Sequence, residues 1–166
     1  MKSLIKISSL IFCVFTLSGC FGSIDEATQN ALEACGIVKY VPPVGDSVVD
    51  ENTPKKGDYV FAPPDFENLW DITDDIKSHQ ERSALWSERA ISASSASKLD
   101  SRFTSLSIPT TNLANMNQNV VTIREDMLND GYISYGEYDW TFLESYNTDL
   151  NTWKIECTAI NNTLNK

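Results

Sequence analysis

The cysteines are the side chains in this 166-residue sequence whose chemistry depends most directly on position. A thiol can be acylated or alkylated, or it can be oxidised to a disulfide, and the compartment decides between these reactions. Cys13 and Cys20 lie near the amino terminus, whereas Cys35 and Cys157 lie in the remaining part of the chain. The residues around Cys13 and Cys20 indicate the compartment, and the compartment in turn bears on the chemistry of Cys35 and Cys157.

The first 19 residues have the anatomy of a secretory signal peptide. Two lysines open the segment, a mainly apolar run follows from Ile7 to Leu17, and two small residues precede Cys20. The tetrapeptide Leu17-Ser18-Gly19-Cys20 resembles the lipobox of bacterial lipoproteins. This resemblance implies that residues 1–19 are removed and that Cys20 carries a diacylglycerol and further acyl chains such as palmitate. The mature domain would then be tethered to a membrane by its first residue.

The residue after the lipobox bears on which membrane holds the protein. In lipoproteins of Gram-negative bacteria, an aspartate directly after the lipidated cysteine tends to retain the protein in the inner membrane. Phe21 occupies that position here. For a Gram-negative host, the resemblance therefore implies a lipid-anchored protein of the outer membrane that faces the periplasm.

The charge of the chain limits its partners. The sequence has 13 Lys and Arg against 23 Asp and Glu, so loss of Lys2 and Lys6 with the signal peptide changes the net charge from −10 to −12. Nucleic-acid phosphates and anionic lipid headgroups repel such a chain. We therefore expect no nucleic-acid partner, and we expect the acyl chains on Cys20 to make the membrane contact. After the signal peptide, no apolar run is long enough to predict a transmembrane helix.

Cys35 and Cys157 remain as a pair once the lipoprotein resemblance assigns Cys13 to the signal peptide and Cys20 to the lipid. A compartment outside the cytoplasm usually permits oxidation, so we predict a disulfide between them. Such a bond would close a loop of about 120 residues and contribute about 4–5 kcal/mol in the chain-entropy model. The alternative is a pair of buried free thiols that act as small apolar side chains.

Residues 20–36 are expected to form the lipidated amino terminus and one short helix. Ser23 and Glu26 have the spacing of a capping box, and small apolar residues recur on one side of a helix from Ile24 to Cys35. Gly36 follows as the terminator. Because this helix has few large apolar groups, we expect a bridge from Cys35 to anchor it to the domain.

Residues 37–64 form a connector that is rich in proline and glycine. Two β-prone pieces, Val38–Val41 and Tyr59–Phe61, indicate a small hairpin within it. Its aromatic side chains, including Tyr40, favour packing on the helices because large apolar groups are costly to leave in water. A spacer that carries the domain away from the membrane is the alternative.

Residues 65–166 are predicted to form a helical bundle. Asp65 can cap a first helix, and apolar residues then recur at steps of three and four as far as Leu106. Ile108-Pro109 is expected to end this helix. The pattern leaves open whether the helix is continuous over 65–106 or breaks in the Ala/Ser-rich stretch 90–97.

A second helix of the bundle is predicted after Pro109, because its apolar residues step by three and four as in a coiled coil. These residues are Leu113, Met116, Val120, Ile123 and Met127. Asp130-Gly131 should stop this helix, and a capping box at Ser134 and Glu137 should start the last one, which runs almost to Lys166. We therefore predict a mainly α fold: an elongated three-helix bundle with a helical hairpin at the carboxyl terminus and a short amino-terminal helix.

The acids from Asp126 to Glu137 have the one metal-like spacing in the sequence. They resemble an EF-hand loop, with Gly131 at position 6 and Ile133 at position 8. The oxygen donors of this candidate calcium site would be Asp126, Asp130, Tyr132, Ser134 and Glu137. Leu128 stands where the loop normally offers an oxygen, and the other residues also serve as helix caps. We therefore expect no resident metal or cofactor, with Ca²⁺ at this loop as the alternative.

The only histidine, His79, has Ser78, Glu81 and Ser83 near it in sequence. No nucleophile elbow surrounds these serines, so we expect a partly exposed histidine on a helix and no catalytic site. The four tryptophans are expected in the bundle core or at an interface rather than in a ligand cage. They are Trp70, Trp86, Trp140 and Trp153.

The expected function is that of a non-enzymatic outer-membrane lipoprotein that presents an acidic helical module to protein partners in the cell envelope. The alternative is a lipoprotein encoded by a phage or plasmid that acts in exclusion of competing elements or in host lysis. The helices rich in Asn, Ser and Thr fit that origin weakly. An enzyme is a third possibility, and it would need a pocket with converging acids or with His79.

Overall fold

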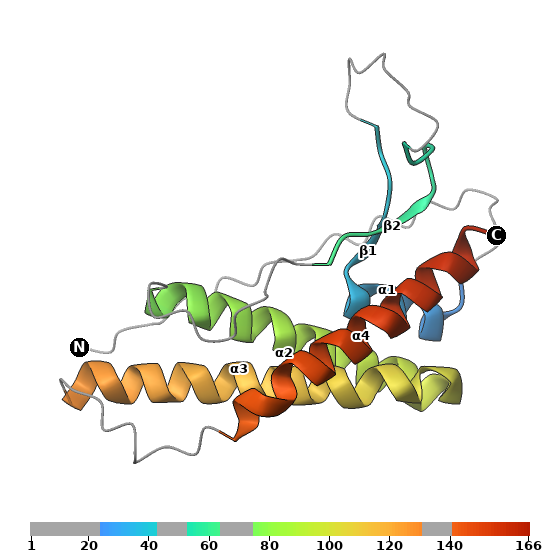
Figure 1. Cartoon of the computed structure of the whole chain (residues 1–166). Coiled ribbons are helices and arrows are strands. Elements are labelled where there is room, and N and C mark those ends of the chain that lie inside the picture. The colour runs from blue at the N-terminus through green and yellow to red at the C-terminus, as the bar shows by residue number, and fades with distance from the viewer. Residues whose placement is uncertain (1–23, 43–52, 64–74, 131–140) are drawn as a thin grey trace, which may run out of the picture.

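The computed structural model describes residues 24–42, 53–63, 75–130 and 141–166 of the chain (Figure 1). These residues form the α-helices α1 (Glu26–Cys35), α2 (Ile76–Leu99), α3 (Thr104–Asp130) and α4 (Phe142–Leu164), with a 3₁₀ turn η1 (Ser101–Phe103). Two short strands, β1 (Ile37–Lys39) and β2 (Tyr59–Phe61), pair antiparallel. The predicted mainly α class is confirmed.

The three long helices form the body of the molecule (Figure 1). α2 and α3 lie side by side, α4 crosses them obliquely, and α1 packs on α2 and also contacts α4. The β hairpin follows the end of α1, and β2 contacts α4. Among the described residues, no helix has both the length and the hydropathy that a membrane crossing requires.

α2 is shorter than the predicted helix at both ends. It begins at Ile76 because Asp75 has extended backbone angles and its carboxylate accepts a hydrogen bond of 2.7 Å from the backbone N–H of Ser78. It ends at Leu99, where Asp100 is again extended and accepts from the backbone N–H of Arg102 at 2.9 Å. One continuous helix over 65–106 is therefore excluded, and a break lies at Asp100, after the stretch 90–97. The predicted cap Asp65 lies outside the described residues.

Pro109 does not end a helix, which corrects the second predicted boundary. It lies inside α3, whose first residue is Thr104. A proline this close to a helix start removes a single backbone hydrogen bond. The hydroxyls of the next two residues, Thr110 and Thr111, donate to the carbonyls of Leu106 and Ser107 at 2.6 and 2.8 Å. The turn η1 is the short connection between α2 and α3, and the two helices pack on each other as a helical hairpin. The sequence pattern did not indicate this hairpin.

α1 has the predicted end and a different start. Its cap is Asp25, whose carboxylate accepts from the backbone N–H of Thr28 at 2.7 Å. Ser23, the cap that the sequence suggested, lies outside the described residues, and Glu26 is the first residue of the helix. Gly36 terminates α1 with a φ of 68°, a left-handed conformation that glycine adopts without strain.

The apolar core follows the predicted faces. The coiled-coil-like residues of α3, from Leu113 to Met127, are all buried, as are Tyr146, Trp153 and Cys157 on α4. α1 and α2 both bury small side chains where they pack on each other, which lets the two helices lie close together. These small residues are Ala27, Ala31, Ala34, Ala93 and Ala96.

The β hairpin is held to the helices rather than extended as a spacer. Tyr59 and Phe61 pack against the core, as predicted. The side-chain amide of Asn165, at the end of α4, pairs with the outer edge of β2: its Nδ2 donates to the carbonyl of Tyr59 at 2.7 Å, and its Oδ1 accepts from the N–H of Tyr59 at 2.8 Å. The carboxyl terminus thus fixes β2 in place.

Candidate functional site

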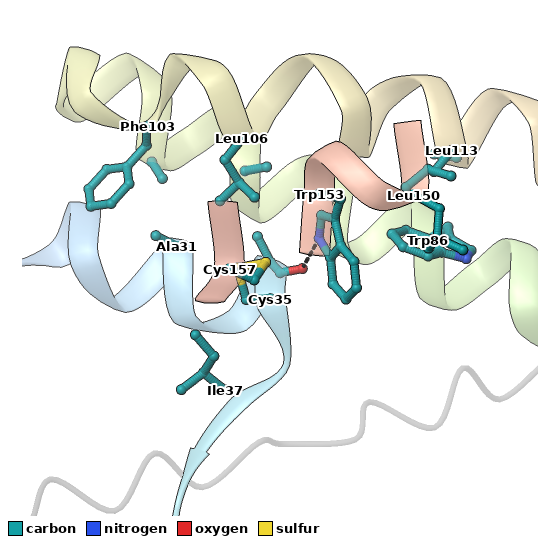
Figure 2. Close-up of a cluster of buried hydrophobic side chains, with 14 of the residues drawn as sticks. Ala31, Cys35, Ile37, Trp86, Phe103, Leu106, Leu113, Leu150, Trp153 and Cys157 are labelled. Carbon is teal, nitrogen blue, oxygen red and sulfur yellow. Dashed lines mark hydrogen bonds between the residues drawn. A yellow bond between two sulfur atoms is a disulfide. The ribbon is translucent and has the colours of Figure 1, made fainter. Parts of the chain in front are cut away.

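Cys35 at the end of α1 and Cys157 on α4 form a disulfide, as predicted, with their Cα atoms 5.4 Å apart (Figure 2). Both side chains are completely buried. The bond joins positions 122 residues apart, so the chain-entropy model assigns it about 4–5 kcal/mol of stabilisation. It ties α1 to α4, the first and last helices of the described residues.

Two buried tryptophans extend this contact between α1, α2 and α4 (Figure 2). Trp86 and Trp153 are fully buried, and their rings meet edge to face with centroids 5.1 Å apart. The indole N–H of Trp153 donates to the carbonyl of Ala34 at 3.3 Å, and Phe61 from β2 meets the same ring at 5.5 Å. Aromatic pairs in such edge-to-face geometry stabilise a core beyond the area they bury.

Arg89 is a buried cation at the same place. Its side chain is 9% exposed, and its guanidinium carbon lies 5.2 Å from the ring centroid of Trp86 and 5.0 Å from that of Trp153. Among the described residues no carboxylate forms an ion pair with it, so the two ring faces supply its electrostatic stabilisation. Burial lowers the pKa of Arg89 to about 10, so the group is charged at neutral pH.

Gly36 makes room for this cation. A Cβ atom at residue 36 would lie 2.7 Å from Nη2 of Arg89, so any other residue would displace the guanidinium. The positive charge also lies beside the carboxyl end of α1, where the helix dipole is negative. We name this group the junction: Cys35, Gly36, Trp86, Arg89, Trp153 and Cys157. Its geometry holds three helices together.

A pocket of about 340 Å³ lies at the other end of α1, between α1, η1, α3 and α4. This volume falls in the range of about 300–1,000 Å³ that is typical of small-molecule sites. Its apolar lining comes from Phe103, Leu106, Ala159, Ile160 and Leu164. Its charged lining comes from Asp25, Arg102 and Glu156. We name it the amino-terminal pocket, because Asp25 is the cap of the first helix.

The charged groups of the amino-terminal pocket are already engaged with other groups. Hydrogen bonding from Thr28 keeps the pKa of Asp25 below its usual value. Arg102 donates through Nε to Asp100 at 2.7 Å, and this bond raises the pKa of Arg102 and lowers that of Asp100. Glu156 accepts from the hydroxyl of Ser105 at 2.8 Å. The pocket is therefore better suited to binding an apolar ligand than to catalysing a reaction that needs a free acid and a free base.

His79 is 2% exposed, which corrects the prediction of a partly exposed side chain. It lies on the face of α2 that also buries Ser83 and Trp86, at helical steps of four and three. The hydroxyl of Ser83 hydrogen-bonds to Oε1 of Gln118 at 3.0 Å, and Glu81 pairs with Lys77 at 3.2 Å. The neighbouring serine and acid that the sequence places around His79 thus have contacts of their own.

The candidate calcium loop is only partly within the described residues. Asp126 and Asp130 lie in the last turns of α3, and Asp126 is half-buried. Tyr132, Ser134 and Glu137 lie outside the described ranges, so the structure does not test the alternative of calcium binding at this loop. Within those ranges, no three His, Cys, Asp or Glu side chains gather as a metal site would require.

The remaining predicted sites divide in the same way. Trp86 and Trp153 lie in the core, as expected, whereas Trp70, Trp140 and the lipidation candidate Cys20 lie outside the described residues. Sequence reasoning missed Arg89, although a signal was present: it lies three residues after Trp86 and four before Ala93, on the buried face of α2.

Comparison with known proteins adds no relative. No family model matches the chain, and no curated protein or solved structure matches it.

Proposed function

We propose that this protein is a lipoprotein anchored by Cys20, in the outer membrane for a Gram-negative host, and that its helical bundle is a non-enzymatic interaction module of the cell envelope. The observation that carries this proposal is the attachment of α1 to the bundle. α1 begins six residues after Cys20 and is bonded to α4 through Cys35. An anchor at Cys20 would therefore hold the whole folded domain and not only a loose amino-terminal segment.

The length of the tether supports a domain close to the membrane. Ile24, the first described residue, follows Cys20 by four residues, which span at most about 14 Å when fully extended. The contacts of β2 with Asn165 and with the core keep the described part of the connector on the domain, so it adds no reach. A partner would thus meet the bundle within a short distance of the lipid surface.

The charge of the mature domain indicates the kind of partner. With a net charge near −12 after loss of the signal peptide, the domain is repelled by anionic surfaces and attracted to cationic ones. Electrostatic complementarity mainly raises association rates and gives specificity. A basic protein surface in the envelope is therefore the class of partner that this charge favours.

The test is intact mass measurement with membrane fractionation of the full chain, of Cys20→Ala and of a matched control, Cys13→Ala. We expect the wild type and Cys13→Ala to lose residues 1–19, to gain the mass of at least two acyl chains and to sediment with the outer membrane. Cys20→Ala should gain no acyl mass and should leave the membrane fraction. An unmodified Cys20 in the wild type would overturn the proposal.

A further inference from the structure

We propose that the amino-terminal pocket holds one acyl chain of the lipid attached to Cys20. This inference rests on the proposed function, because it requires the lipid. The pocket would then be an intramolecular lipid site, and the anchor would divide its acyl chains between the membrane and the protein.

The position of the pocket places it within reach of the lipid. Asp25 lies on its rim, and Cys20 precedes Asp25 by five residues, which span at most about 17 Å. The beginning of α1 and the end of α4 lie at the same end of the molecule (Figure 1). Both contribute residues to the lining of the pocket. The lipid would therefore enter from the side of the domain on which the chain emerges.

The lining of the pocket suits a hydrocarbon chain. Phe103 comes from the turn between α2 and α3, Leu106 from the first turn of α3, and Ile160 and Leu164 from the last two turns of α4. Ile160 and Leu164 are only partly buried although both pack on the core, so part of their apolar surface remains for a guest to cover. Burial of apolar surface is the main driving force for such a complex.

The charges on the rim favour a chain of the protein's own lipid over a free fatty acid. Asp25 and Glu156 are acids, and the one cation of the lining, Arg102, is held by Asp100. The carboxylate of a free fatty acid would face this acidic rim without an available cation. The acyl chains of a diacylglycerol are joined through neutral ester groups, so only their hydrocarbon would have to be accommodated.

Capture of one chain would weaken the anchor. A single acyl chain gives only marginal, reversible membrane binding, whereas two or more hold a protein stably. When Cys20 carries a diacylglycerol and a further acyl chain, capture of one chain leaves two in the bilayer, so the protein would stay anchored but be held less tightly.

The experiment uses a photoreactive fatty acid that cells incorporate into the lipid on Cys20. The purified full-length lipoprotein is placed in phosphatidylcholine vesicles at about one copy per vesicle, irradiated, reduced and digested with trypsin. The readout is the cross-link yield in the peptide 155–166, which contains Ile160 and Leu164, relative to the peptide 90–98 from α2. Incorporation of the label is checked first by intact mass.

Two alanine-to-tryptophan substitutions distinguish blocking of the pocket from the general effect of a tryptophan added to the surface. Ala159 and Ala84 are both exposed helical residues, but only Ala159 lines the pocket. We expect Ala159→Trp to fill the pocket and to lower the cross-link yield in peptide 155–166 at least fivefold, while Ala84→Trp leaves it unchanged. Thermal unfolding followed by circular dichroism confirms that both variants fold.

Four outcomes would overturn the inference. Label on Cys20 with cross-links only to vesicle lipids, or equal yields in Ala159→Trp and the wild type, would reject the intramolecular site and leave the proposed anchor intact. Cross-linking of the free fatty acid in peptide 155–166 of Cys20→Ala, at the same yield as in the wild type, would show that the pocket takes free fatty acids instead. Absence of label on Cys20 would reject both the inference and the proposed function.

Discussion

The junction and the amino-terminal pocket share two helices, α1 and α4, but use them in opposite ways. At the junction, Cys35, Trp153 and Cys157 are completely buried. At the pocket, α4 presents the exposed Ala159 and the half-buried Leu164, which follow Cys157 by about 3 Å and about 10 Å at a rise of 1.5 Å per residue. The comparison teaches that cross-linking one point of a helix pair allows its other end to stay open.

The physical reason lies in how stabilisation is distributed. A small helix such as α1 is marginal alone and depends on tertiary packing. The disulfide, the tryptophan pair and Arg89 supply that packing at the carboxyl end of α1, so its amino end does not have to be closed by apolar side chains. The open end is also the end that faces the predicted lipid.

The largest expected effect comes from breaking the junction covalently. Replacement of both Cys35 and Cys157 by alanine should lower the free energy of unfolding by about 4–5 kcal/mol, because the unfolded chain regains the entropy of a long loop. Urea unfolding of the non-lipidated Cys20→Ala protein, with and without the two further substitutions, measures this difference. A loss below 1 kcal/mol would show that the non-covalent contacts of the junction suffice.

The next effect distinguishes packing from charge at Arg89. Arg89→Ala should lower the free energy of unfolding by about 2 kcal/mol, because it removes a side chain stacked on two aromatic rings. Arg89→Met should cost less than about 1 kcal/mol, since a buried ion can often be replaced by an apolar group of similar shape. Chemical denaturation of both variants separates the contribution of packing from that of charge. Equal losses of unfolding free energy in the two variants would mean that the charge itself is required.

A pH experiment tests whether water is excluded from the side chain of Tyr146, in the buried part of α4. Burial raises the pKa of Tyr146 to about 12, against an ordinary value of 10. Between pH 10 and 12 the unfolded chain loses the tyrosine proton while the folded chain keeps it, so stability falls as the pH rises, by up to about 2 kcal/mol. Tyr146→Phe should lack this part of the fall. Parallel pH profiles of both proteins would contradict a dry environment at Tyr146.

The smallest expected effect belongs to the pocket. Ala159→Trp on the non-lipidated protein should lower the free energy of unfolding by no more than about 0.5 kcal/mol, because the position is exposed and the larger side chain displaces no packed group. Urea unfolding beside Ala84→Trp checks this result. A loss of several kcal/mol would show that the end of α4 is packed as tightly as the junction and would remove the contrast between the two regions.

Much of the fold follows from patterns that repeat along the sequence. The apolar steps from Leu113 to Met127 predict the buried face of α3, and Gly36 predicts the end of α1, because both signals are local and each is reinforced by its neighbours. The boundaries of α2 were missed because their signals are not distinctive. Asp75 and Asp100 cap the two ends of the helix, but acidic residues are common in this chain, so neither residue stood out.

The candidate site was harder to predict, since its residues come together only in three dimensions. The disulfide could be predicted because only two cysteines remain once the resemblance to lipoproteins accounts for the others. The amino-terminal pocket could not, because Phe103 and Ile160 lie on different helices and their facing surfaces depend on how α4 crosses the bundle. Arg89 looked like an ordinary charged residue until its tryptophan neighbours were known.

The disulfide also makes the chain from residue 35 to residue 157 a closed covalent ring. The segments between β1 and β2, between β2 and α2, and between α3 and α4 all lie within this ring. A protease that cuts the backbone once inside the ring would open it without releasing either piece. Such a nicked molecule would keep both fragments joined until the bond between Cys35 and Cys157 is reduced.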